Sequence, residues 1–220
     1  MIPYVNAPRQ RLTRQKRQAE THQALVEAAA AVFAERGFTA ASLDEIAERA
    51  GYTRGAIYAN FADKDELFLT LVERHKSAFI DAFEQAAAMA SAQERLAAVQ
   101  ALLTGGPPGL AADWTVLWAE LWLHAARHPE VAERLAEQER RYRGAVAGLL
   151  DIVAADLGVE LSAPAEELAA EVIALDVGLA LQWRLAPELG PDALGRAIVR
   201  LLGIHPPPAA GGPDSEGADP

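Results

Sequence analysis

The chain has 220 residues, of which 51% are hydrophobic and none is cysteine, and its formal net charge is −11. This composition provides for a sizeable core but excludes a disulfide framework and a thiolate metal site, and the charge argues against a protein that coats nucleic acid with its whole surface. No apolar run approaches the roughly 18 residues of a membrane-spanning helix and the first residues lack a signal-peptide pattern, so we expect a cytoplasmic protein with no membrane partner.

The charge is distributed unevenly along the chain. Residues 1–80 contain 11 basic and 10 acidic side chains, whereas residues 81–220 contain 9 basic and 21 acidic ones. The first 19 residues contain no acid and five basic side chains, namely Arg9, Arg11, Arg14, Lys16 and Arg17. Phosphate contacts would therefore be confined to the beginning of the chain. We expect residues 1–12 to form a flexible basic arm, and a solvated tail without a ligand is the alternative.

Two helices are predicted before residue 52. The first runs from about residue 13 to residue 36 and stops at Gly37. Its buried stripe is predicted to be Leu25, Ala29, Val32 and Phe33. The second follows Ser42, which forms a capping box with Glu45, and it ends at Gly51, where a positive φ angle costs little.

A third, short helix follows a tight turn, with Thr53 as its predicted N-cap. Ile57 and Phe61, four residues apart, should pack it against the other two helices. A rotation of about 100° per residue then leaves Gly55, Tyr58 and Ala59 facing outward, with Arg54 at the edge. The arrangement is typical of a helix–turn–helix that places one helix in the major groove of DNA. The alternative is an ordinary helical bundle with a solvated polar face.

This stretch resembles the DNA-binding domain of TetR-family (tetracycline-repressor-like) transcriptional regulators. The resemblance rests on GFTAASLDEIA from residue 37, AGYTRGAIYANF from residue 50, and Lys64, and it covers about the first 70 residues. It implies a three-helix DNA-binding domain over residues 13–62 and an all-helical effector-binding and dimerisation domain over residues 63–204.

The resemblance also implies roles for single residues. Ser42 would touch a phosphate, Thr53 and Arg54 would contact a phosphate or a base edge, and Gly55 would admit the backbone to the groove. The full predicted DNA-binding set is Ser42, Thr53, Arg54, Gly55, Tyr58, Ala59, Asn60 and Lys64, the last pairing with a phosphate and Tyr58 and Asn60 donating to phosphates. Ala59 departs from the family pattern, which has a larger polar or aromatic residue there. Alanine offers a thymine methyl only apolar contact, so base readout would depend on Arg54 and on DNA shape.

The remaining chain is predicted to be helical with few interruptions. Six more helices are expected, starting at Lys64, Ser91, Asp113 and Pro129 and spanning 165–186 and 191–202. The segment TGGPPGLAA, from residue 104, breaks the periodicity, and residues 205–220, rich in proline and glycine, should form a disordered tail. About nine helices and no strand define an all-α fold.

The last two predicted helices carry nearly continuous apolar runs. A helix that is apolar on almost all sides is buried or shared between subunits, and Ala174, Gly178 and Ala180 would permit close approach of another helix. The resemblance implies a homodimer formed by a four-helix bundle of these two helices from each subunit. A purely intramolecular core is the alternative.

Three tryptophans recur every four residues, at positions 114, 118 and 122. They either fill a core or form the wall of an apolar effector pocket, which the resemblance supports. The predicted effector-binding set is Trp114, Trp118, Glu120, Trp122, His124, Asp176 and Trp183. His124 and His128 have a spacing that suits a metal, but no third ligand is apparent, so neither a metal nor a cofactor is expected.

These patterns predict a ligand-responsive transcriptional regulator, a repressor that binds a palindromic double-stranded DNA operator as a homodimer and is released by a small, mostly apolar effector. A helical protein-interaction module without DNA binding is one alternative. An all-helical enzyme is a weaker one, because no glycine-rich phosphate loop, nucleophile elbow, HExxH motif or paired-carboxylate arrangement is visible.

Overall fold

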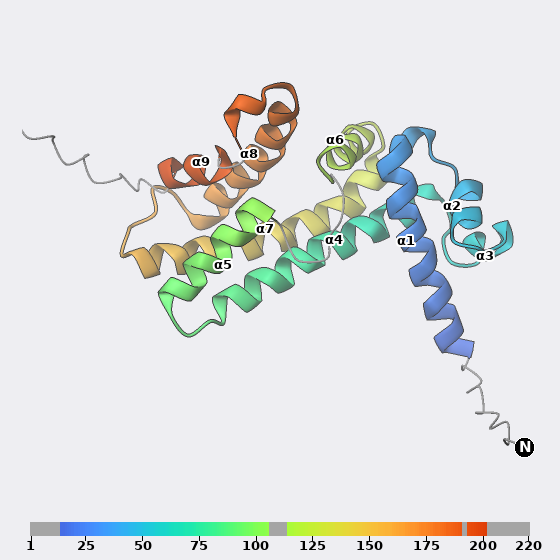
Figure 1. Ribbon diagram of the computed structural model, residues 1–220, viewed down its shortest axis with the longest axis horizontal. Helices are drawn as coiled ribbons and strands as arrows, with labels where there is room; N and C mark the ends of the chain where they lie inside the picture. The colour runs from blue at the N-terminus through green and yellow to red at the C-terminus, as the bar shows by residue number, and fades with distance from the viewer. Residues whose placement is uncertain (1–13, 106–113, 191–192, 202–220) are drawn as a thin grey trace, which may run out of the picture. The chain divides into compact units, whose positions relative to one another are not determined.

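The computed structural model describes residues 14–105, 114–190 and 193–201. In these ranges the chain is helical, with no strand (Figure 1). Its elements are α1 Arg14–Ala40, α2 Leu43–Arg49, α3 Arg54–Tyr58, α4 Lys64–Ala87, α5 Ala92–Gly105, α6 Trp114–Ala125, α7 Pro129–Leu157, α8 Ala165–Leu185, the 3-10 turn η1 Pro187–Leu189, and α9 Ala193–Leu201. The predicted all-α fold is confirmed. The predicted basic arm, most of the TGGPPGLAA break with the helix start at Asp113, and the predicted tail lie outside the described residues.

The described residues fall into two compact units. Of the described residues, unit 1 draws on 14–75 and 114–135, and unit 2 draws on 76–105, 136–190 and 193–201. Both α4 and α7 therefore contribute to both units, and α6 belongs to unit 1 together with α1, α2 and α3. This division differs from the predicted boundary after residue 62, because apolar side chains of α6 are buried in the same core as those of α1.

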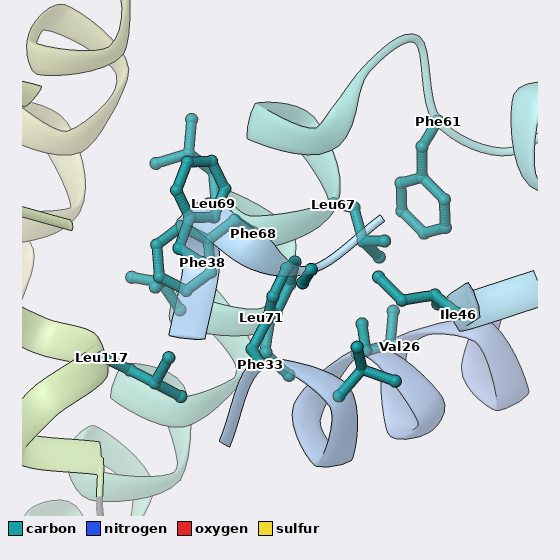
Figure 2. Packing of buried hydrophobic residues seen from close by; sticks show 14 of the residues in the cluster. Val26, Phe33, Phe38, Ile46, Phe61, Leu67, Phe68, Leu69, Leu71 and Leu117 are labelled. Carbon is teal, nitrogen blue, oxygen red and sulfur yellow. The ribbon is translucent and has the colours of Figure 1, made fainter. Parts of the chain in front are cut away.

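The core of unit 1 follows from the apolar spacing of α1. The predicted stripe of Leu25, Ala29, Val32 and Phe33 is confirmed, since all four side chains are completely buried. The ring of Phe68 lies 5.0 Å from that of Phe33 and 4.6 Å from that of Phe38, and Leu117 and Leu121 of α6 complete the cluster (Figure 2). Full burial of such a side chain contributes roughly 1.5–3 kcal/mol, so this core determines how α2 and α6 lie against α1.

The core of unit 2 lies mainly between α7 and α8. Its buried members are Val146, Ala147, Leu149, Leu150, Val153, Leu168, Ala169 and Val172. Arg95 of α5 donates two hydrogen bonds to Asp156 of α7, one of them at 2.6 Å from Nε, and a third to the carbonyl of Met89 at 2.7 Å. The hydrogen bonds from Arg95 hold the pKa of Asp156 below its ordinary value.

Unit 2 also contains a buried ion pair. Lys76 of α4 is 3% exposed, its ammonium group pairs with the carboxylate of Glu139 on α7, and it lies 5.0 Å from the ring centroid of Tyr142. Desolvation lowers the pKa of Lys76, and the pairing with Glu139 raises it by a smaller amount. Breaking such a pair by removing one partner leaves a buried charge uncompensated.

Replacement of Glu139 by alanine should therefore lower the free energy of unfolding by about 3 kcal/mol, measured by urea denaturation. Addition of Lys76→Met to that variant should recover most of the loss, because neither charge of the Lys76–Glu139 pair then remains. The control is Glu137→Ala, which breaks an exposed pair with Arg140 and should cost less than about 0.5 kcal/mol. Equal losses in the two glutamate variants would contradict this account.

Lys76 should also make the free energy of unfolding depend on pH in the alkaline range. The folded state holds this proton less tightly than the unfolded state does, because the folded pKa lies below the ordinary value of 10.5. The free energy of unfolding should therefore rise as the pH increases through the folded pKa toward 10.5. This rise should be smaller in Lys76→Met, where only the lowered pKa of Lys64 still contributes to it. A variant with the same alkaline profile as the wild type would contradict the assignment.

Candidate nucleic-acid interface

Two side-chain caps define the helix–turn–helix. The Ser42 hydroxyl accepts a hydrogen bond from the amide of Glu45 at 3.2 Å, and Thr53 Oγ1 accepts one from the amide of Ala56 at 3.3 Å. Between the two helices, Gly51 adopts a φ of 76°, a backbone conformation that residues other than glycine rarely take. The two predicted hydroxyl caps and the predicted glycine turn are thus confirmed. The Glu45 carboxylate pairs with Arg36 Nε at 3.3 Å, so among the described contacts the carboxylate half of the predicted capping box is not formed.

The two faces of α3 differ sharply in exposure. Ile57 is completely buried and Phe61 is 2% exposed, as the spacing predicts. On the other side of the helix, Tyr58 is 48% exposed. The remaining exposed residues on this side are Arg54, Gly55 and Ala59. We call these four residues the outer face of α3.

Gly55 is not required by the fold of the chain itself. A Cβ atom placed on it would meet, among the described residues, only Thr53 Oγ1, at an ordinary contact distance of 3.8 Å. The φ angle of Gly55 is not in the left-handed region either, unlike that of Gly51. A glycine in the middle of a helix costs roughly 0.5–1 kcal/mol relative to alanine. Its position on an exposed face therefore suits close approach by an external molecule.

Arg54 is held at the edge of the outer face by two neighbours. Its Nε lies 3.1 Å from Asp44 Oδ1, and its guanidinium lies 5.6 Å from the ring centroid of Tyr58. The Tyr58 side chain, and then the charge of Asp44, raise the pKa of Arg54, which stays cationic at every physiological pH. The pair with Asp44 is exposed and therefore weak, so a phosphate or a guanine edge can compete for the guanidinium.

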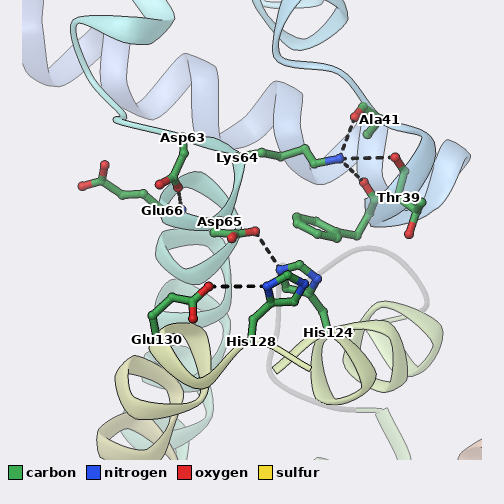
Figure 3. Close-up of polar contacts among 10 residues, drawn as sticks. Thr39, Ala41, Asp63, Lys64, Asp65, Glu66, His124, His128 and Glu130 are labelled. Atoms are coloured by element: carbon green, nitrogen blue, oxygen red, sulfur yellow. Dashed lines mark hydrogen bonds and ion pairs between the residues drawn. The ribbon is translucent and has the colours of Figure 1, made fainter. Parts of the chain in front are cut away.

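Two other residues that are predicted to contact DNA donate hydrogen bonds to backbone carbonyls of the chain itself. Asn60 Nδ2 donates to the Ala56 carbonyl at 2.8 Å. Lys64 Nζ donates to the carbonyls of Phe38 at 2.8 Å, Thr39 at 3.3 Å and Ala41 at 3.1 Å (Figure 3). These bonds use all three ammonium hydrogens, and burial lowers the pKa of Lys64. Lys64 thus ties the start of α4 to the end of α1, and a phosphate contact would replace one of these bonds.

The predicted effector-binding residues do not gather in one unit. Five belong to α6 in unit 1, while Asp176 and Trp183 belong to α8 in unit 2. Trp114 and Trp118 pack against the core of unit 1, and the exposed fractions of Trp122 and Trp183 are 37% and 45%. Among the described residues, no group of three or more histidine, aspartate and glutamate side chains could hold a metal ion.

The two polar residues of the predicted effector-binding set that lie on α6, Glu120 and His124, contact other helices of unit 1. Glu120 Oε2 accepts a hydrogen bond from the amide of Phe38 at 2.5 Å. His124 Nε2 lies 3.0 Å from Asp65 Oδ1 (Figure 3). The His124 ring also lies 4.8 Å from the Phe38 ring and 4.2 Å from that of His128. In this structure these two side chains connect α6 to α1 and α4.

Sequence reasoning missed a polar and aromatic cluster in unit 2. Tyr142 lies 6.1 Å from both Phe79 and Phe83, measured between ring centroids. Burial, followed by the charges of Asp176 and Glu139, raises the pKa of Tyr142. The carboxylate of Asp176 keeps contact with solvent, but the protein atoms around it displace enough water to raise its pKa as well. The helical spacing of Lys76, Phe79 and Phe83 places them on one face of α4, and this spacing is the sequence signal that could have indicated the cluster.

Residues 25–71 match the family described as bacterial regulatory proteins of the tetR family, and residues 92–202 match the C-terminal domain of BetI-type transcriptional repressors. The second match alone covers half of the chain. The protein therefore belongs to the TetR family of bacterial regulatory proteins.

Individual relatives share either sequence or fold with this chain. The HTH-type transcriptional activator FasR of Mycolicibacterium smegmatis is 40% identical over 76 residues, which are 34% of this chain and 33% of FasR. The match spans between about a quarter and a third of the length of the first three of these curated relatives.

Two solved structures share the fold over most of their length. A transcriptional regulator from Saccharomonospora viridis in complex with choline superposes with a TM-score of 0.66 at 24% identity, covering 84% of this chain and 97% of that one. The regulator FadR from Bacillus subtilis in complex with stearoyl-CoA gives a TM-score of 0.61 at 22% identity, covering 84% and 100%. None of the helices within the described ranges combines the length and apolar character needed to span a bilayer.

Proposed function

We propose that this chain is a sequence-specific transcriptional regulator that binds double-stranded DNA in the cytoplasm through the outer face of α3. The observation that carries the proposal is the exposed glycine at position 55, which the fold does not require and which lies between Arg54 and the exposed Tyr58. The match to BetI-type repressors supports repression, and the relative FasR, an activator, makes activation the second candidate.

The proposed regulator acts as a homodimer. Unit 2 exposes large apolar side chains near the end of α8, where Leu185 is 89% exposed and Trp183 is 45% exposed, and α9 adds Val199 at 40%. Exposed apolar surface of this kind is typical of protein interfaces. Two copies related by a twofold axis would present two outer faces to a palindromic operator.

The proposed effector site lies in unit 2. Tyr142, Phe79 and Phe83 provide an aromatic surface, and Glu139 and Asp176 provide charge beside it. Sites for small molecules combine many apolar side chains with few polar ones in this way. An effector that switches operator occupancy from almost full to almost empty needs about 5.5 kcal/mol of preference for the non-binding state.

Selection of bound duplexes from random DNA tests the proposal, followed by screening of compounds that release the selected duplex. The expected result is enrichment of a palindrome whose half-sites lie about one helical turn apart. Recovery of no consensus would overturn DNA recognition. The remaining candidates would then be a helical protein-interaction module and an enzyme.

Replacement of Arg54 by alanine should weaken binding to the selected duplex by about 1–3 kcal/mol, or about 5-fold to 150-fold, and should relax the preference at one base pair in each half-site. The control is Arg74→Ala, which removes another exposed arginine of unit 1, paired with Glu27 at 3.7 Å. Fluorescence anisotropy at several salt concentrations measures both variants. If both bind like the wild type, Arg54 does not read the bases.

A further inference from the structure

The end of α1 is held from two sides by other helices of unit 1. At Gly37 the backbone turns with φ 74° and ψ 166°, and the next amide, that of Phe38, donates to Glu120 of α6. The carbonyls of Phe38, Thr39 and Ala41 accept hydrogen bonds from Lys64 of α4 (Figure 3). We call residues 37–41 the elbow.

The elbow lies where the two ends of the helix–turn–helix meet. Ser42, the cap of α2, follows it directly, and Lys64 begins α4 three residues after the buried Phe61 that packs α3. The Lys64 bonds therefore join the exit of the helix–turn–helix to its entry. Any shift of the elbow relative to α6 would move α2 and α3 with it.

Glu120 fits against the elbow closely. A Cβ atom on Gly37 would lie only 2.7 Å from Glu120 Oε1, so any larger residue there would displace the carboxylate from this position. The positive φ of Gly37 favours glycine independently of this contact. One turn further along α6, His124 approaches Asp65 near the start of α4. The same side of α6 thus contacts both the elbow and α4.

We propose that Glu120 is a positioning residue for operator recognition: its carboxylate fixes the elbow, and thereby α3, without reaching the DNA. A charged acceptor on a backbone amide makes a strong, directional hydrogen bond. Base-edge contacts tolerate errors of only about 0.5 Å, whereas phosphate contacts depend mainly on charge. The loss of Glu120 should therefore reduce sequence-specific binding more than non-specific binding. This inference rests on the proposed DNA-binding function.

The test compares affinities for the selected duplex and for a scrambled duplex of the same length and composition. In Glu120→Ala the ratio of the affinity for the selected duplex to that for the scrambled duplex should fall at least about tenfold. In Glu120→Gln, which keeps an acceptor oxygen, this ratio should fall only about twofold to threefold. The control is Glu133→Ala, which removes the same charge from an exposed position of unit 1 and should leave the ratio unchanged. A ratio for Glu120→Ala equal to that of the control would overturn the inference. If Glu120→Ala does not fold, a Glu120→Gln ratio equal to the control does so.

A second measurement does not involve DNA. Hydrogen exchange at the Phe38 amide should be faster in both Glu120 variants than in Glu133→Ala. Gly37→Ala should lower the melting temperature less in the Glu120→Ala background than in the wild type, because the close contact is then gone. Unchanged exchange or additive losses would contradict the contact. A wild type without preference for any duplex would overturn the proposed function, while the exchange and melting data would still report on the elbow.

Discussion

Replacement of Gly55 by alanine should weaken operator binding at least about tenfold, or about 1.4 kcal/mol, while the free protein becomes no less stable. In the free chain the added methyl group meets only Thr53 Oγ1, at 3.8 Å, and alanine favours a helix over glycine by roughly 0.5–1 kcal/mol. In the proposed complex the same methyl group lies between α3 and the DNA. Binding and stability should therefore change in opposite directions.

The matched control is Gly148→Ala. Gly148 is an exposed glycine inside α7, and a Cβ atom there would meet no described atom within 4 Å. Both variants should melt at or above the wild-type temperature, but only Gly55→Ala should lose affinity in anisotropy titrations. Equal affinities for the two variants would show that α3 does not approach DNA closely, and a destabilised Gly55→Ala would show that the fold needs this glycine.

Replacement of Leu185 by aspartate should produce a monomer at micromolar concentration and weaken operator binding about a hundredfold or more. Leu185 is the most exposed large apolar side chain among the described residues, at 89%. If it is buried between two copies, a carboxylate there must lose its water without gaining a partner. A monomer would engage one half-site only and lose the gain in affinity that comes from linking two binding sites.

Leu157→Asp is the control for the predicted effect of Leu185→Asp on dimer formation. Leu157, the last residue of α7, is 41% exposed and lies outside α8 and α9. Sedimentation velocity should show a dimer for the wild type and for Leu157→Asp, and a monomer for Leu185→Asp. A dimeric Leu185→Asp variant with wild-type affinity would place the interface elsewhere. A monomeric wild type would overturn the proposed dimer.

The parts of the fold that sequence predicts well are those decided by near neighbours. Ser42 and Thr53 each bond an amide three residues further on, and Ile57 and Phe61 share a face because they are one turn apart. Gly37 was predicted to stop the first helix, and it kinks the chain there through its positive φ. Such features depend on helical geometry, which sequence spacing expresses directly.

The parts that sequence did not predict depend on partners distant in the chain. The sequence does not show that Glu120 accepts a hydrogen bond from the amide of Phe38, 82 positions away, and its predicted contact with an effector stays a prediction. The ammonium of Lys64 bonds carbonyls 23 to 26 positions away, and Lys76 pairs with Glu139 across 63. Helical periodicity places a side chain on a face but does not name the element that the face meets.

Hydrogen exchange of the full chain with and without the selected duplex tests the central claim most directly. If the outer face of α3 binds DNA, amides of Arg54–Tyr58 and of the α2–α3 turn should become protected, and those of unit 2 in α5 and α7 should change little. Protection concentrated in unit 2, with α3 exchanging as in the free protein, would contradict the account.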